Sequence, residues 1–147
     1  MSSLAFNKRA NFDYEIEEKF EAGIELKGYE VKAVKNGHMQ IAGSYAVIRH
    51  NEVWLLNSHI PPYQPKNTPK EYDPARSRRL LLTKKETSYL SGKLHEKGLT
   101  LLPLEVYTKR GLIKIKLGLG KPLKKSDKRE IIRKRETKKE IERALRE

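Results

Sequence analysis

The chain has 147 residues, a length that suits one domain with its own core. Its 32 lysines and arginines against 19 acidic residues give a formal net charge of +13, which favours a polyanionic partner. No apolar run approaches the roughly 20 residues of a membrane span, and the N-terminus has no signal-peptide stretch, so we expect a soluble protein with no membrane association. Zero cysteines exclude disulfides and thiolate metal sites and suit the reducing cytoplasm.

Charge is distributed unevenly along the chain. Residues 120–147 hold 12 basic and 6 acidic residues, a net of +6, whereas residues 1–119 hold 20 and 13, a net of +7. Between these parts, Gly118, Gly120 and Pro122 are expected to interrupt any regular element. We therefore predict a folded body over residues 1–119 and a basic tail over residues 120–147.

The body is predicted to be mainly β. Two pairs of β-prone runs, each pair separated by a short polar turn, have the lengths of hairpins: 45–49 with 53–56, and 101–108 with 112–119. Helices are predicted for residues 28–34 and after the capping box that starts at Thr83. Several short strands with two or so short helices favour an oligonucleotide-binding-like β-barrel over a βαβ sheet.

The last predicted strand alternates in character along its length. Ile115 and Leu117 are predicted to face the core, while Lys114 and Lys116 form a basic stripe on the outer face. Trp54 lies in another apolar run and is assigned to the core rather than to a base-stacking surface.

No pattern of catalytic or metal-binding residues emerges from the sequence. The four histidines have no ligand-like spacing, and there is no nucleophile elbow or Cys–His pair. The many carboxylates fit a solvated strand face with salt-bridge partners better than a general acid–base pair. We expect a protein without catalytic residues, metal or cofactor.

Several basic and aromatic residues are candidates for RNA contact. Arg76 and Arg78, two apart in a proline-rich extended segment, are predicted to point the same way and form a ladder for successive phosphates. Tyr63, beside prolines, is the better stacking candidate because loop aromatics are accessible. Further candidates are Asn7, Lys8, Arg9, Lys32 and His59.

The tail carries a pattern typical of a helix. Asp127 is a candidate N-cap with Glu130 three residues later, and pairs of opposite charge follow at helical spacing. Its few apolar residues form too thin a stripe to dock firmly on the body. We expect the tail to become ordered on a structured RNA.

These features, taken in order, resemble the small protein B family, also called SsrA-binding proteins, from about residue 7 to the end. The matching segments are Asn7-Lys8-Arg9-Ala10, Tyr14 to Ile24, Leu26 to Lys32, Ser44-Tyr45, His59 to Tyr63, Pro74 to Arg78, Leu80-Leu81-Leu82, Lys97 to Leu101, Pro103-Leu104 and Asp127-Lys128-Arg129.

The resemblance implies a monomeric adaptor that binds the tRNA-like domain of transfer-messenger RNA. It would deliver that RNA to stalled ribosomes for trans-translation, with its tail helical in the empty messenger channel at the decoding centre. Glu21, Leu81 and Lys114 match positions tied to RNA binding in the family, and Tyr14 lies in a matching motif. Residues implied to contact the ribosome are Lys124, Lys125, Ser126, Asp127, Lys128, Arg129, Arg133 and Lys134.

Three positions depart from the usual family pattern. Asn11 and Phe12 stand where an Arg-His pair is common, and Pro122-Leu123-Lys124 replaces Gly-Lys-Lys. Ser126 stands where an aromatic residue or histidine is usual, so a hydroxyl replaces a stacking ring. Two other functions stay open at this point: a structural, ribosome-associated protein that binds ribosomal RNA, and an RNA-processing enzyme.

Overall fold

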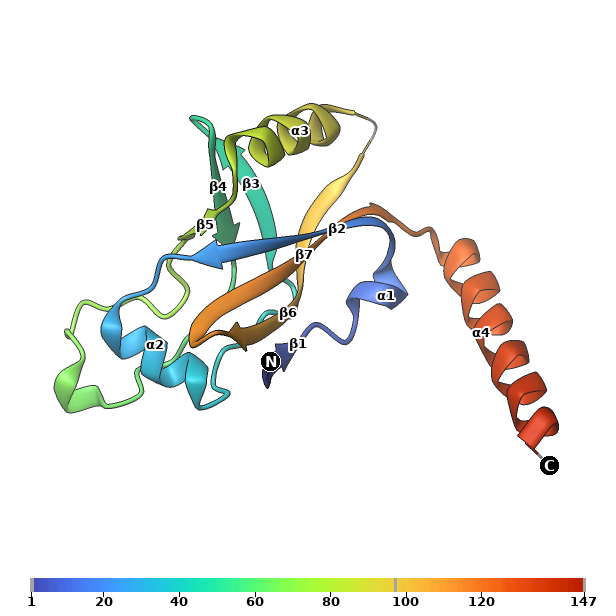
Figure 1. Ribbon diagram of the computed structural model, residues 1–147, viewed down its shortest axis with the longest axis horizontal. Helices are drawn as coiled ribbons and strands as arrows, with labels where there is room; N and C mark the ends of the chain where they lie inside the picture. Colours follow the sequence, from blue (N-terminus) through green and yellow to red (C-terminus); the bar gives the residue numbers. More distant parts are fainter. Residues whose placement is uncertain (1, 97, 147) are drawn as a thin grey trace.

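The computed structural model describes residues 2–96 and 98–146, and within the last helix it leaves out the side chains of residues 125–128, 130–132 and 146. Figure 1 shows the arrangement of its helices and strands. The elements in chain order are β1 (Ser2–Phe6), α1 (Ala10–Asp13), β2 (Tyr14–Ile24), α2 (Gly28–Lys35), β3 (Tyr45–Arg49), β4 (Glu52–Leu56), the 3-10 helix η1 (Pro65–Asn67), β5 (Arg78–Leu81), α3 (Lys84–His95), β6 (Thr100–Lys109), β7 (Leu112–Pro122) and α4 (Lys125–Arg146).

The strands form one antiparallel sheet that closes on itself. Their order is β1-β6-β3-β4-β5-β2-β7, and an additional pairing of β6 with β7 completes the ring. The long strands β2, β6 and β7 form its most extensive ladders. The predicted mainly-β barrel and both predicted hairpins are therefore confirmed.

The barrel interior is filled by alternate residues of the strands. Ile115 and Leu117 of β7 are fully buried, as the alternation predicted, while Lys114 and Lys116 lie on the outer face. Leu90 of α3 and Val34 of α2 complete the core from the two helices. Figure 1 shows α3 and α2 at opposite ends of the barrel.

The glycines near the end of β7 were predicted to interrupt the strand, and this prediction is wrong. The strand continues to Pro122, and Gly118 and Gly120 are buried within it. A Cβ on Gly118 would lie 2.9 Å from Leu104 Cδ1, and one on Gly120 would lie 2.9 Å from Ile16 Cδ1. The two glycines therefore make room for side chains of the neighbouring strands.

The β3–β4 hairpin places Trp54 on the outside. Its turn residues His50 and Asn51 have φ angles of 52° and 62°, the left-handed values that a tight two-residue hairpin requires. Val53 and Leu55 are then buried, so Trp54 between them faces outward and is half-buried. The assignment of Trp54 to the core is wrong, because an apolar run in a half-exposed strand still alternates between faces.

Both predicted body helices are present. The Thr83 hydroxyl caps α3 by accepting a hydrogen bond from the Glu86 amide at 3.1 Å. The Glu86 carboxylate in turn accepts a hydrogen bond from the Thr83 amide. At the start of α2, the Glu30 carboxylate likewise accepts a hydrogen bond from the Lys27 amide, at 2.8 Å. Each helix start is thus determined by its local sequence.

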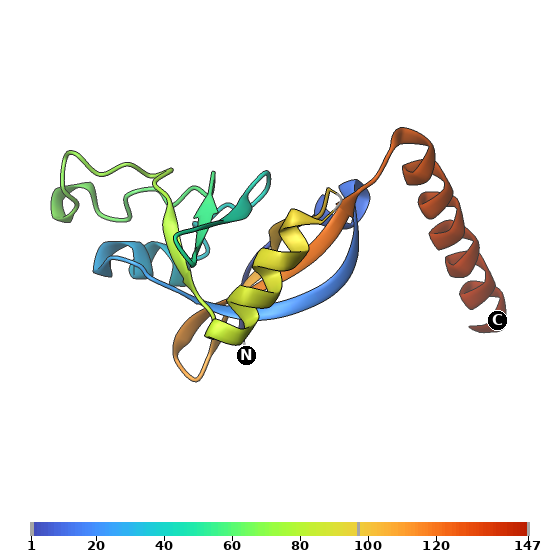
Figure 2. The same ribbon diagram turned by 90° about the horizontal axis from the view of Figure 1, so that it is seen from above.

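Helix α4 extends away from the barrel (Figures 1 and 2). It begins at Lys125, so Asp127 lies within the helix and is not its N-cap. The Arg135 guanidinium donates to the Asn11 carbonyl at 3.2 Å. Ile141 and Leu145 are 56% and 82% exposed, so the apolar stripe of the helix is not covered there. Within the described residues, no helix is long and apolar enough to span a membrane.

Candidate nucleic-acid interface

A shallow cleft lies on the outer face of the barrel where β2, β5 and β7 run side by side. Gly23 is paired with Leu81 on one side and with Lys114 on the other. Because Gly23 has no side chain, Leu81 and Lys114 approach each other across it: a Cβ there would lie 3.4 Å from Leu81 Cβ and 3.8 Å from Lys114 Nζ. No local sequence pattern indicates that this glycine separates the two residues.

This hollow, the Leu81 cleft, has a volume of about 250 Å³. Its apolar surface includes Leu81 and Leu112, which are 44% and 62% exposed. Lys114 and Lys35 line the same cleft, and among the described residues no carboxylate does so. The described residues that line it are Gly23, Ile24, Leu26, Val31, Lys35, Leu81, Gly111, Leu112, Ile113 and Lys114. An apolar floor with cations beside it suits a nucleotide, which has a flat base and an anionic phosphate.

Glu21 lies on the same outer face and is held in its charged form. The Tyr107 hydroxyl donates to the Glu21 carboxylate at 2.5 Å, and Lys109 Nζ lies 3.3 Å from it. The hydrogen bond from Tyr107 is the main cause that lowers the pKa of Glu21, and Lys109 and Lys114 add to it. Burial, together with the bond to Glu21, raises the pKa of Tyr107. The fixed carboxylate repels phosphate and can orient a neighbouring cation.

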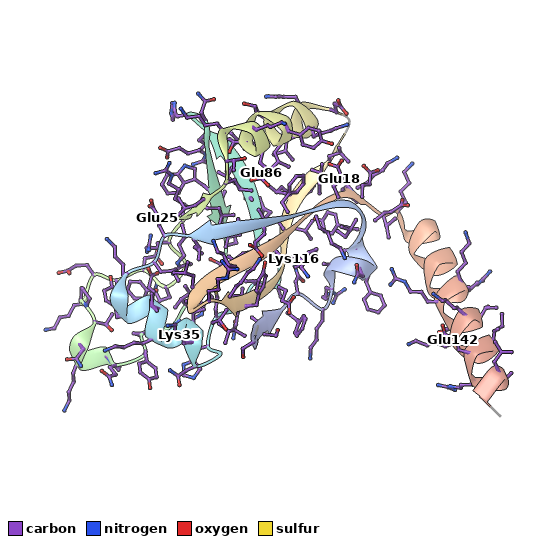
Figure 3. The ribbon with its side chains drawn as sticks, in the orientation of Figure 1. Glu18, Glu25, Lys35, Glu86, Lys116 and Glu142 are labelled. Carbon is purple, nitrogen blue, oxygen red and sulfur yellow. The ribbon has the colours of Figure 1, made fainter. Side chains whose placement is uncertain are left out.

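Lys116 extends the basic stripe along β7, and Figure 3 labels it beside that strand. Its ammonium group lies 3.7 Å from the Glu105 carboxylate and 6.0 Å from the centre of the Tyr107 ring. Lys116 is 43% exposed in this pair, so its ammonium group can turn from the carboxylate to a phosphate at little cost.

The predicted phosphate ladder of Arg76 and Arg78 is wrong for Arg78. The two arginines do point the same way, but they point toward the Glu30 carboxylate of α2 rather than toward solvent. Arg78 Nη2 lies 2.8 Å from Glu30 Oε2, and neither side chain has any exposed surface. Arg76 is bound to the same carboxylate and is 28% exposed.

Burial by itself would raise the pKa of Glu30. Hydrogen bonds from Arg76, the Lys27 amide and Arg78 outweigh it and lower the pKa to about 2. The sequence did hold a sign of this role, because Glu30 shares one helical face with the buried Ala33 and Val34. A lone carboxylate on an apolar face needs an internal partner.

Asn7 has a structural role in the fold, and its RNA contact stays a prediction. It is 9% exposed, and its side-chain amide donates to the Pro103 carbonyl at 2.9 Å. The neighbouring Lys8 and Arg9 are exposed, and Arg9 is 3.6 Å from Asp13. Tyr14 is half-buried at the start of β2.

The remaining predicted body contacts lie outside the Leu81 cleft. His59 lies before the proline-rich loop and Tyr63 lies within it, and both are exposed. The ring of Tyr63 is 5.9 Å from that of His38. Lys32 is exposed on α2. The structure therefore brings Glu21, Leu81 and Lys114 together on one face of the barrel. It places His59, Tyr63 and Lys32 elsewhere.

The structure describes the side chains of only some residues that were predicted to contact the ribosome. Lys124, Arg129, Arg133 and Lys134 are exposed. The side chains of Lys125, Ser126, Asp127 and Lys128 lie outside the described residues. Among the residues that are described, no group of three or more His, Asp or Glu side chains could hold a metal ion.

The closed sheet and its cationic outer face define a small basic β-barrel of the nucleic-acid-binding kind. The family model described as "SmpB protein" matches residues 4–147, and the chain belongs to this family.

Individual relatives agree with this assignment. The SsrA-binding protein of Synechococcus elongatus is 46% identical over 142 residues, which cover 97% of this chain and 92% of the relative. The SsrA-binding protein of Geobacillus kaustophilus is 46% identical over 144 residues, covering 98% and 92%. A solved chain described as "tmRNA-SmpB: a journey to the center of the bacterial ribosome" superposes with a TM-score of 0.68 at 43% identity. It covers 90% of this chain and 96% of its own length.

Proposed function

We propose that this protein is a non-catalytic adaptor in bacterial ribosome rescue. It binds the tRNA-like domain of transfer-messenger RNA and brings that RNA to stalled ribosomes in the cytoplasm for trans-translation. Family membership supports the proposal, as do relatives named SsrA-binding protein and a structural match from a transfer-messenger RNA complex on the bacterial ribosome.

The observation that carries the proposal is the Leu81 cleft. Leu81 and Lys114 converge across Gly23, and the fixed carboxylate of Glu21 lies on the same face. An apolar floor can pack against a base or sugar while Lys114 and Lys35 neutralise phosphates. The body, residues 1–119, is thus proposed to recognise the RNA.

The tail, residues 120–147, is proposed to contact the ribosome. Helix α4 extends away from the barrel, meets the body through the hydrogen bond from Arg135 to Asn11, and leaves Arg129, Arg133 and Lys134 exposed. A basic helix of this kind can enter a channel lined by ribosomal RNA without disturbing the barrel. With Ser126 in place of a ring, its contacts there would depend on charge and hydrogen bonds.

The test is a comparison of affinities at one fixed salt concentration. The protein should bind transfer-messenger RNA more tightly than ordinary transfer RNA or duplex RNA, and equal affinity for all three would contradict the proposal. Stoichiometric co-purification with intact ribosomal subunits would instead favour a structural ribosomal protein. Metal-dependent cleavage of RNA, abolished by a carboxylate substitution, would show an enzyme.

A further inference from the structure

Trp54 is the single tryptophan of the chain, and its side chain is outside the core. The strand alternation that buries Val53 and Leu55 turns Trp54 to the outer face of β4. Its cross-strand neighbour on β5 is Arg79, which also faces outward. A large aromatic ring placed in this way is not needed to fill the barrel.

Trp54 forms one wall of a second hollow, the Trp54 cleft, with a volume of about 560 Å³. The other residues that line it are Ile24, Glu25, Leu26, Lys27, Arg76 and Arg79. Three of these are cations and one is a carboxylate. Arg76 is held by the Glu30 carboxylate, so Lys27 and Arg79 are the cations of this cleft that can meet a ligand beside the flat wall of Trp54.

The cation beside Trp54 is only loosely paired. Arg79 lies 3.5 Å from Glu25 and 3.8 Å from Glu52, and all three side chains are between 37% and 55% exposed. Glu25 is labelled in Figure 3 near the end of β2. Exposed pairs at such distances contribute little, so Arg79 can turn to a phosphate without a large loss.

The Trp54 cleft adjoins the Leu81 cleft. Ile24 and Leu26 line both hollows. Arg79 and Leu81 are two residues apart on β5, so they share one face at a separation of roughly 7 Å. An RNA strand with one nucleotide at Leu81 would thus have a nearby nucleotide beside Trp54.

We propose that Trp54 is a stacking platform for an unpaired base of the bound RNA, with Arg79 and Lys27 taking the adjacent phosphate. This inference rests on the proposed function and extends its interface along β5 to β4. The indole face matches a base better than it matches an acidic peptide, because a peptide carboxylate has no aromatic surface to stack. Among the described residues the indole N–H has no hydrogen-bond partner, and it can donate to the same nucleotide.

Because Trp54 is the only tryptophan, its fluorescence reports directly on this contact. Titration of the full chain with transcribed transfer-messenger RNA should quench the indole emission in step with binding measured by gel retardation. A fully paired RNA duplex, which offers no free base, should leave the emission nearly unchanged. Emission that stays constant while the transfer-messenger RNA binds would overturn the inference.

Substitution supplies the second arm of the test. W54L should weaken binding by about 5- to 100-fold, since one base stack is lost, whereas W54F should stay within about 3-fold of wild type. Y89L is the matched control, because Tyr89 is an aromatic side chain on α3 that is 42% exposed and outside both clefts. Circular dichroism and thermal unfolding check that each variant is folded.

The outcomes separate this inference from the proposed function. If W54L binds transfer-messenger RNA as wild type does, Trp54 is not a stacking platform and the proposed function still stands. If the wild-type protein does not prefer transfer-messenger RNA, the proposed function itself fails. Equal losses in W54L and Y89L would also refute a specific role for Trp54.

Discussion

Glu30 and Arg78 form an ion pair in which both side chains are completely buried, with 2.8 Å between Oε2 and Nη2. Arg78 also donates to Ser58 Oγ at 2.9 Å and to the Pro74 carbonyl at 2.9 Å. The Tyr72 hydroxyl donates to Glu30 at 3.0 Å. This cluster fastens the proline-rich loop to α2, close to the strands that carry both clefts.

The first prediction concerns the stability of this cluster. E30Q should lower the free energy of unfolding by about 3–5 kcal/mol, because the guanidinium of Arg78 would be left buried without its counter-charge. Urea denaturation measures the change. E25Q is the control, since the exposed pair of Glu25 with Arg79 should cost less than about 1 kcal/mol. Similar losses in both variants would show that burial does not strengthen the Glu30 pair.

The pH dependence of stability should reflect Glu30. Its pKa falls from an ordinary value of 4.5 to about 2 in the folded protein. The folded state therefore binds the proton less readily than the unfolded chain. The stabilisation is complete above about pH 4.5 and is lost as the pH falls toward 2. The gap between the two pKa values corresponds to about 3 kcal/mol.

Unfolding free energies measured from pH 6 to pH 2 check this expectation. Wild type should lose stability faster than E30Q below pH 4.5, because only wild type must protonate this carboxylate. Parallel curves for the two proteins would show that Glu30 does not contribute to the acid sensitivity.

The close packing of β2 against β7 predicts a cost for any side chain at Gly120. A Cβ there would lie 2.9 Å from Ile16 Cδ1 and 3.1 Å from the Glu15 carbonyl, which is backbone and cannot easily move. G120A should therefore destabilise the protein by about 1–3 kcal/mol. G92A is the control in α3, where a Cβ would meet nothing within 4 Å, and it should stabilise by about 0.5–1 kcal/mol. Thermal unfolding of both variants distinguishes these effects.

Lys114 should contribute one phosphate contact. K114A should weaken binding of transfer-messenger RNA and flatten the slope of log affinity against log salt by somewhat less than about 1. K93A provides the control, since Lys93 lies on α3 outside the Leu81 cleft. A salt slope that is the same in K114A and wild type would show that Lys114 does not touch a phosphate.

The division between body and tail can be tested by truncation. The truncation should remove the residues after Lys124 rather than those after Gly120. The reason is that Pro122 pairs with Tyr14 and the Leu123 amide donates to the Asp13 carbonyl at 2.9 Å, so both residues belong to the body. A chain that ends at Lys124 should bind transfer-messenger RNA as before and lose rescue activity on stalled ribosomes. Full rescue by the truncated chain would refute the proposed role of the tail.

Local sequence was enough for the features that depend on near neighbours in the chain. The alternation around Ile115 and Lys114 predicted which face of β7 is buried, and the Thr83 capping box predicted the start of α3. Composition separated a basic tail from a β-rich body, and an ordered series of motifs indicated the family. These signals are local because strand faces and helix caps are determined within a few residues.

Only the tertiary structure decided which residues meet across the barrel. It turned Arg78 inward to Glu30, 48 residues away in the chain, and used Gly120 to admit Ile16 rather than to end a strand. It also brought Leu81 and Lys114 together across Gly23. The spacing of arginines and glycines along one segment does not reveal the partner that lies opposite. That partner is determined by strand pairing between distant segments, and this pairing forms the proposed RNA-binding face.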